Sequence, residues 1–170
     1  MEFRFLAHRF LIYIQILQMP KVVISDTSTL ILFHKIDEFS LLEKVYGELI
    51  TTPEIAEEFG EDLPDWIRIQ KVSDKKYQDF LETQIDCGEA SAIALATEYD
   101  DVLLLLDDLK ARKLAIQLRF KITGTLGVIH HRAKQMSVID KVKPLIDKLL
   151  LTDFRVADNI IEEILKLNSE

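Results

Sequence analysis

The sequence of 170 residues contains few cysteines and glycines and lacks a long apolar run. The single cysteine, Cys87, excludes a disulfide within the chain, so we expect a buried structural thiol in a cytoplasmic protein. The five glycines match neither a dinucleotide-binding loop nor a P-loop. The apolar core at residues 10–17 is far shorter than the ~20 residues that cross a bilayer, so we expect no membrane attachment.

The first eighteen residues differ in character from the rest. They are apolar and basic, and no small-residue cleavage site follows them, so a secretory signal is not predicted. Met19 stands directly before Pro20 and the first clear strand. We therefore expect Met19 to be the true start, with residues 1–18 as an extension and residues 19–170 as a single domain.

Acidic residues are absent between Leu109 and Ile139, although the whole chain carries a net charge of −8. Seven basic residues lie in this stretch: Lys110, Arg112, Lys113, Arg119, Lys121, Arg132 and Lys134. One face of the protein is therefore expected to be basic and suited to a polyanion. The alternative is an ordinary solvated helix surface.

Apolar periodicity predicts alternating strands and helices. The predicted strands are Lys21–Ser25, Glu48–Thr51, Trp66–Val72 (an outer strand), Val102–Leu106 and Lys121–Thr123. The predicted helices are Ser28–Lys35, Glu38–Tyr46, Glu54–Phe59, Lys75–Ile85, Gly88–Tyr99, Leu109–Leu118, Leu126–Gln135, Val138–Leu151 and Val156–Leu167. This order indicates an α/β fold with a mainly parallel sheet.

Carboxylates follow two of the predicted strands directly. Asp26 follows the first strand, and Asp107 and Asp108 follow the uninterrupted aliphatic run before them. Asp at such junctions is most often a helix N-cap. However, parallel neighbouring strands end at the same edge of a sheet, where sites form in α/β folds, so Asp26 and Asp107 are also expected to lie together.

Further carboxylates occur early in two predicted helices. Glu58 borders the apolar face of the helix after the second strand, and Glu57 lies about 100° away around the helix. Each has the alternative of being a solvated helix residue. Glu89 opens the helix GEASAIALA, where the helix dipole alone favours an acid.

Four clustered carboxylates destabilise a protein unless a cation neutralises them. At about 4 Å, two ionised carboxylates repel by on the order of 4 kcal/mol at an effective dielectric constant of about 20. Mg²⁺ and Mn²⁺ prefer carboxylate oxygens, and such ions activate water for phosphodiester cleavage. The set of acids therefore suggests metal-dependent hydrolysis of a nucleic acid.

Five segments in order resemble the PIN-domain nuclease family, in its VapC-toxin-related branch. They are ISDTS (24–28), PEIAEEF (53–59), CGEASAIALA (87–96), LLLLDD (103–108) and ITGTLGVI (122–129), and the tail DFRVADNIIEEIL is similar too. The resemblance covers nearly the whole chain from Lys21. It implies a three-layer α/β/α fold with about five mainly parallel strands, a Mg²⁺ or Mn²⁺ site, and endoribonuclease activity.

The resemblance also implies residue roles. The catalytic acids would be Asp26, Glu58, Glu89 and Asp107, with Glu58 chosen over Glu57. The metal ligands would be Asp26, Glu89 and Asp107, with Asp108 as an accessory ligand. Residues that support the substrate would be Thr27, Ser28, Lys110, Arg112 and Lys113, of which the basic three bind phosphates. His130 and His131 are expected to be structural.

Other readings remain open. A haloacid-type phosphatase needs Asp-x-Asp, but Ser28 occupies the second position; a receiver domain needs paired acids, but Asp26 stands alone. A PIN-like binding module without catalysis is the main alternative. The resemblance implies RNA as substrate, an antitoxin protein as partner and a homodimer, which we expect to form through the region of Phe33 and Leu42.

Overall fold

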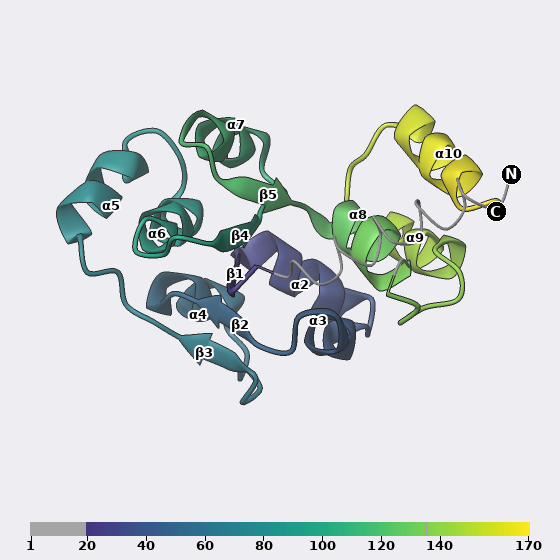
Figure 1. Ribbon diagram of the computed structural model, residues 1–170, viewed down its shortest axis with the longest axis horizontal. Coiled ribbons are helices and arrows are strands. Elements are labelled where there is room, and N and C mark those ends of the chain that lie inside the picture. Colours follow the sequence, from purple (N-terminus) through teal and green to yellow (C-terminus); the bar gives the residue numbers. More distant parts are fainter. Residues whose placement is uncertain (1–19, 135) are drawn as a thin grey trace, which may run out of the picture.

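A five-stranded sheet forms the centre of the computed structural model, which describes residues 20–134 and 136–170 (Figure 1). The strands are β1 (Val22–Ser25), β2 (Leu49–Thr51), β3 (Ile67–Ile69), β4 (Val102–Leu105) and β5 (Lys121–Thr123). Their order is β3-β2-β1-β4-β5, and all neighbours run parallel. The predicted α/β fold with about five mainly parallel strands is confirmed, and β3 is an edge strand as expected.

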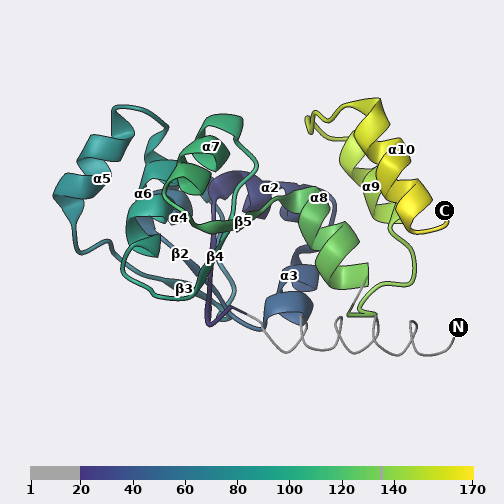
Figure 2. The same ribbon diagram turned by 45° about the horizontal axis from the view of Figure 1, so that its top comes forward.

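Helices cover both faces of this sheet. Those before the last strand are α2 (Thr27–Lys35), α3 (Phe39–Tyr46), α4 (Pro53–Phe59), α5 (Lys75–Glu82), α6 (Cys87–Ala96) and α7 (Leu109–Gln117). Those after it are α8 (Thr125–Gly127), the π-helical segment η1 (Val128–Ala133), α9 (Lys143–Leu150) and α10 (Asp158–Leu167). Figure 2 shows α6 and α7 on one side of the sheet and α3 and α8 on the other.

Two of the three interior strands, β1 and β4, lie at the centre of the hydrophobic core. Ile24 and Leu104 are fully buried register partners, as expected for aliphatic strands covered on both faces. Helix α6 packs against both strands and buries Gly88 and every residue from Ala90 to Ala96. Its small side chains let the helix axis approach the sheet closely. This packing brings the start of α6 to the carboxyl edge of β1 and β4.

The C-terminal helices begin later than their periodicity predicts. The helix predicted from Val138 starts only at Lys143, because Ser137 has a left-handed φ of 57° that ends the preceding helical segment, and Pro144 is tolerated only in the first turn of α9. The helix predicted from Val156 starts at Asp158. Residues 151–157 thus form a connecting segment between α9 and α10.

Two predictions concern surfaces and termini. The side chains of Phe33 and Leu42 are 0% exposed, so they belong to the core and offer no surface for a dimer. The start at Met19 and the extension over residues 1–18 lie outside the described residues. Within residues 20–134 and 136–170, no helix combines the length and apolarity needed to cross a membrane.

Candidate active site

Asp26 ends β1 and caps the N-terminus of α2. Its side chain is fully buried, and Oδ1 accepts a hydrogen bond from the backbone N–H of Thr29 at 2.8 Å. Its Oδ2 accepts a second hydrogen bond from the backbone N–H of Asp107 at 3.2 Å. Asp26 is therefore the N-cap that its position predicts, and the same carboxylate also contacts the end of the neighbouring strand β4.

Asp107 follows β4 and is held by two threonines. Its Oδ1 accepts from the backbone N–H of Thr125 at 3.0 Å, and its Oδ2 accepts from Thr125 Oγ1 at 2.5 Å and from Thr29 Oγ1 at 3.3 Å. Thr125 belongs to the GTLG segment at the start of α8. Our sequence analysis missed both threonines as site residues, although the motif in which Thr125 stands was the available signal.

Burial and the neighbouring Asp107 make ionisation of Asp26 costly. The pKa of Asp26 rises from 3.8 to about 7, first because burial removes the carboxylate from water and second because of the negative charge on Asp107. The hydrogen bonds from Thr29 and Asp107 oppose this rise only in part. The expected convergence of the two acids at one sheet edge is therefore seen.

This pair should make stability depend on pH when no metal is bound. The pKa of Asp26 is higher in the folded state than in the unfolded state. The contribution of protonated Asp26 to the free energy of unfolding is therefore complete below pH 3.8, and it is lost as the pH rises through about 7. Between about pH 5 and about pH 8 the loss should be roughly 3 kcal/mol. Urea unfolding in EDTA should show this decrease in the free energy of unfolding for the parent and a much smaller decrease for Asp26→Asn. Equal decreases in the two proteins would contradict the assignment to Asp26.

Glu58 lies across the site on α4. Thr27 Oγ1 donates a hydrogen bond to Glu58 Oε2 at 2.6 Å. A Cβ atom added at Gly88 would lie 2.8 Å from Glu58 Oε2 and 3.2 Å from Thr27 Oγ1, so only glycine leaves room for this pair beside α6. Both adjacent glutamates are exposed, but among the described residues Glu57 has no such hydrogen bond. The geometry therefore favours Glu58.

Glu89 and Asp108 complete the acidic side of the site. Glu89 is partly buried in the first turn of α6, and its pKa is raised, chiefly by burial and then by the charges of Asp86, Glu58 and Asp108. Asp108 is exposed and caps α7, its Oδ1 accepting from the backbone N–H groups of Lys110 and Ala111, both at 2.8 Å. Asp108 therefore caps the N-terminus of α7 with Oδ1 alone.

The family model of DUF3368, a PIN domain, matches residues 22–170. The chain belongs to the PIN-domain family. PIN domains are generally nucleases, so this membership indicates a hydrolase of nucleic acids. Neither the curated proteins nor the solved structures that were searched contain a match to the chain.

The acids of this PIN domain suit a divalent cation by their chemistry. Among the described residues, none of Asp26, Glu58, Glu89, Asp107 and Asp108 forms an ion pair with Lys, Arg or His. A fully buried carboxylate next to a second one, without a basic partner, is costly unless a cation binds. In residues 20–134 and 136–170, however, no three His, Cys, Asp or Glu side chains are yet close enough to hold a metal together.

Among the residues predicted to bind substrate, Arg112 lies beside an acid of the PIN domain, as Thr27 does. Arg112 Nη1 donates to the carbonyl of Leu106 at 2.9 Å, and a Cβ added at Gly124 would lie 2.7 Å from this Nη1 and 2.6 Å from Asp107 Oδ1. The guanidinium is therefore close to Asp107. Lys110 and Lys113 are exposed on α7, and Ser28 is partly buried on α2.

The two histidines differ in their surroundings. His130 Nδ1 contacts Asn168 Nδ2 at 2.7 Å, and His131 is exposed. Neither takes part in a group that could hold a metal among the described residues.

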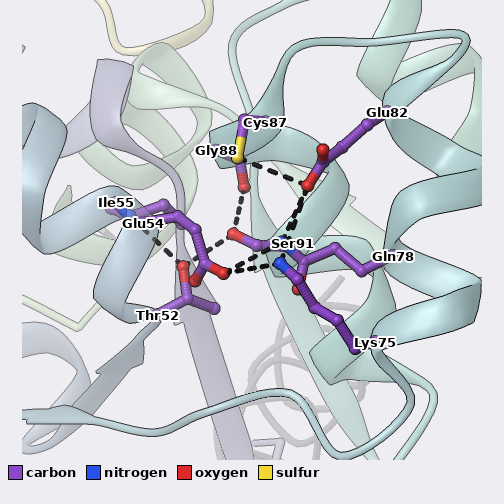
Figure 3. Close-up of polar contacts among 9 residues, drawn as sticks. All are labelled: Thr52, Glu54, Ile55, Lys75, Gln78, Glu82, Cys87, Gly88 and Ser91. Atoms are coloured by element: carbon purple, nitrogen blue, oxygen red, sulfur yellow. Dashed lines mark hydrogen bonds and ion pairs between the residues drawn. The ribbon is translucent and has the colours of Figure 1, made fainter.

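A polar network fixes α4, α5 and α6 behind the PIN-domain acids (Figure 3). Gln78, fully buried on α5, donates to Glu54 at 3.0 Å and to Glu82 at 2.9 Å. Thr52 and Ser91 share a hydrogen bond of 2.6 Å in which either hydroxyl donates. Because Glu54 lies one turn before Glu58, this network sets where α4 stands relative to α6. Nothing in the periodicity of α5 predicted that Gln78 would be buried.

Cys87 belongs to the same network and corrects one prediction. Its thiol is exposed and donates to Glu82 Oε1 at 3.4 Å, whereas we expected a buried cysteine. The apolar residues of α6 face the sheet, but Cys87 starts the helix at the surface. Partial burial, the hydrogen bond to Glu82 and that carboxylate's charge raise the pKa of the thiol to about 11, so it is a poor nucleophile at neutral pH.

Proposed function

We propose that this protein is an endoribonuclease that hydrolyses RNA phosphodiester bonds with Mg²⁺ or Mn²⁺. One observation carries the proposal: a PIN domain holds a fully buried Asp26 beside Asp107, and no basic side chain among the described residues is paired with either. Such a carboxylate pair opposes folding stability, and cation binding offsets the repulsion. The position at the carboxyl edge of the sheet is where α/β folds bind ligands.

Each acid has a role in this proposal. Asp26 and Asp107 would hold the cation, with Glu89 and Asp108 as further ligands, directly or through water. A bound divalent cation lowers the pKa of water and neutralises charge on the leaving oxygen. Glu58, oriented by Thr27, would accept the hydrogen bond that directs the attacking water. As the water oxygen bonds to phosphorus, its proton would pass to bulk water; the bond from phosphorus to the leaving ribose oxygen would break, and that oxygen would take a proton from bulk water.

The basic residues hold the substrate by its backbone. Arg112 lies beside Asp107, and Lys110 and Lys113 extend the positive charge along α7. Contacts of this kind bind phosphates and carry no base information, so their contribution to affinity should weaken as salt rises.

A purified full-length chain tests this proposal directly. With Mn²⁺ or Mg²⁺ it should convert a mixture of cellular RNAs into discrete fragments, and EDTA should stop the reaction. Mapping the fragment ends then identifies the scissile bonds. A chain that binds RNA but produces no new ends with either metal would support the alternative of a binding module without catalysis.

We also propose a biological setting on the basis of the GEA and GTLG motifs. In this setting the protein is the cytoplasmic toxin of a toxin–antitoxin pair, held inactive by an antitoxin protein, and it forms a homodimer. Because Phe33 and Leu42 are buried, such a dimer uses other residues.

A further inference from the structure

A pocket adjoins Asp107 on the side of the sheet edge away from Glu58. Its volume is about 550 Å³, within the range of ~300–1,000 Å³ typical of ligand sites. Asp107, Arg112 and Gly124 line one wall, and the opposite wall comes from the segment between α9 and α10 together with α10 itself. The pocket is therefore continuous with the candidate active site.

The lining is apolar with an aromatic ring and two cations. Phe154 and Ile160 line the C-terminal wall, and Leu126 contributes to the wall from α8. Arg112 and Arg155 are the basic residues of the lining. An apolar cavity with an aromatic side chain suits a flat heterocycle, and the two guanidinium groups suit phosphates on either side of it.

Contacts across the fold hold the wall that contains Phe154. Asp153 Oδ2 pairs with Lys35 Nζ on α2 at 2.8 Å, and the backbone N–H of Phe154 donates to Thr152 Oγ1 at 3.1 Å. Lys148 at the end of α9 pairs with Glu38 at 2.7 Å. The ion pairs are exposed and individually weak, but they set the position of this segment against α2 and α3.

The ring of His130, one of the polar groups of the lining, contacts Asn168. Asn168 Nδ2 donates to the carbonyl of Ile164 and contacts His130 Nδ1, so this ring nitrogen acts as the acceptor. An imidazole whose Nδ1 accepts a hydrogen bond carries a proton on Nε2. His130 is one of the residues that line the pocket, so its ring lies close to the space available to a base.

We propose that this pocket receives one unpaired nucleobase of the RNA next to the scissile phosphate. The inference rests on the proposed function and adds to it a subsite: a cavity beside Asp107 that holds one base of the substrate. A base within a duplex is stacked and paired, so it cannot enter the pocket without being extruded. Phe154 stacks on the base, His130 donates to its edge, and Arg112 and Arg155 bind the flanking phosphates.

Binding without metal tests the pocket independently of cleavage. The probe is a short, labelled single-stranded RNA containing a mapped cut site or, failing one, a mixed sequence; the readout is fluorescence anisotropy in EDTA. Phe154→Leu keeps apolar volume but removes the ring, so affinity should fall about 10-fold. Phe154→Tyr keeps the ring and should bind like the parent. Leu151→Ala, at a side chain that is 89% exposed and outside the pocket, is the control.

Removing the base tests the same contact from the other side. The probes form a series in which each RNA lacks the base at one position. Loss of the base at one of these positions should weaken binding to the parent about 10-fold but should barely change binding to Phe154→Leu. An equal penalty in both proteins would overturn the inference, as would unchanged binding by Phe154→Leu, and a peptide side chain would then be the occupant to seek. Failure of the proposed function looks different: RNA binds as expected, but no metal produces cleavage.

Discussion

Asp107→Asn is expected to reduce metal-dependent cleavage of RNA by about 1,000-fold or more. The substitution removes the negative charge that holds the cation, which corresponds to roughly 4 kcal/mol or more in the activation barrier. The fold should persist, because the amide oxygen can still accept from the backbone N–H of Thr125. The amide nitrogen can donate to the hydroxyls of Thr125 and Thr29, which accept as well as donate.

The measurement is the initial rate of RNA cleavage in saturating Mn²⁺ alongside urea unfolding in EDTA. Asp107→Asn should be at least as stable as the parent, since it removes repulsion with Asp26. Asp100→Asn, at an exposed carboxylate beyond the opposite end of β4, is the matched control and should cut at the parent's rate. If Asp107→Asn also cuts at the parent's rate, the catalytic assignment is wrong.

Asp26→Asn tests the catalytic assignment less directly, because it also removes a structural hydrogen bond. In the parent, Asp26 Oδ2 accepts from the backbone N–H of Asp107, so an amide NH₂ placed there would face another donor. The buried N–H would lose its partner, which costs about 1–3 kcal/mol and partly cancels the gain from removing charge. Activity should still be lost, but stability at one pH would not separate the two effects.

Gly124→Ala is expected to reduce cleavage by about 100-fold without unfolding the protein. A Cβ at this position would lie 2.6 Å from Asp107 Oδ1, 2.7 Å from Arg112 Nη1 and 3.2 Å from the carbonyl of Leu106. The two closest atoms are ends of flexible side chains, so they should move rather than the strand. Gly124 has an extended backbone with φ −127°, which alanine adopts freely, so steric contact with Asp107 and Arg112 is the cause.

A double variant separates this displacement from a general loss of structure. If Gly124→Ala acts by moving the carboxylate, then Gly124→Ala combined with Asp107→Asn should be no slower than Asp107→Asn alone. Urea unfolding should place Gly124→Ala within about 2 kcal/mol of the parent. If the fold-reductions in cleavage rate of the two single variants multiply in the double variant, the alanine at position 124 acts by some route other than displacing the Asp107 carboxylate.

Much of the fold follows from local chemistry that is readable along the chain. The aliphatic runs before Asp26 and Asp107 predict buried strands, and the strand–helix alternation predicts a parallel sheet, because each pattern depends on neighbours within a turn or a strand. Ser137 and Pro144 show where this local information fails to place the start of a helix. The apolar periodicity continues through residues 138–142, but the backbone at Ser137 is left-handed and the helix starts later.

The site was predictable to a similar extent. The positions of Asp26 and Asp107 at one edge follow from the ends of adjacent parallel strands. In contrast, the choice of Glu58 over Glu57 depends on how α4 is rotated toward Thr27, which the polar network around Gln78 sets. The contact of Thr125 with Asp107 and the apolar pocket beside them depend on where α8 and the C-terminal segment pack.

The sequence by itself determined the order of elements, the family and which carboxylates follow strands, since these depend on residue type and short spacing. Tertiary structure alone decided that Thr29 and Thr125 hold Asp107, that Gln78 is buried, that Cys87 is exposed and that Phe154 lines a pocket together with Asp107. The physical reason is distance along the chain. Thr29 and Asp107 are 78 residues apart, and only strand register and helix packing bring such pairs into contact.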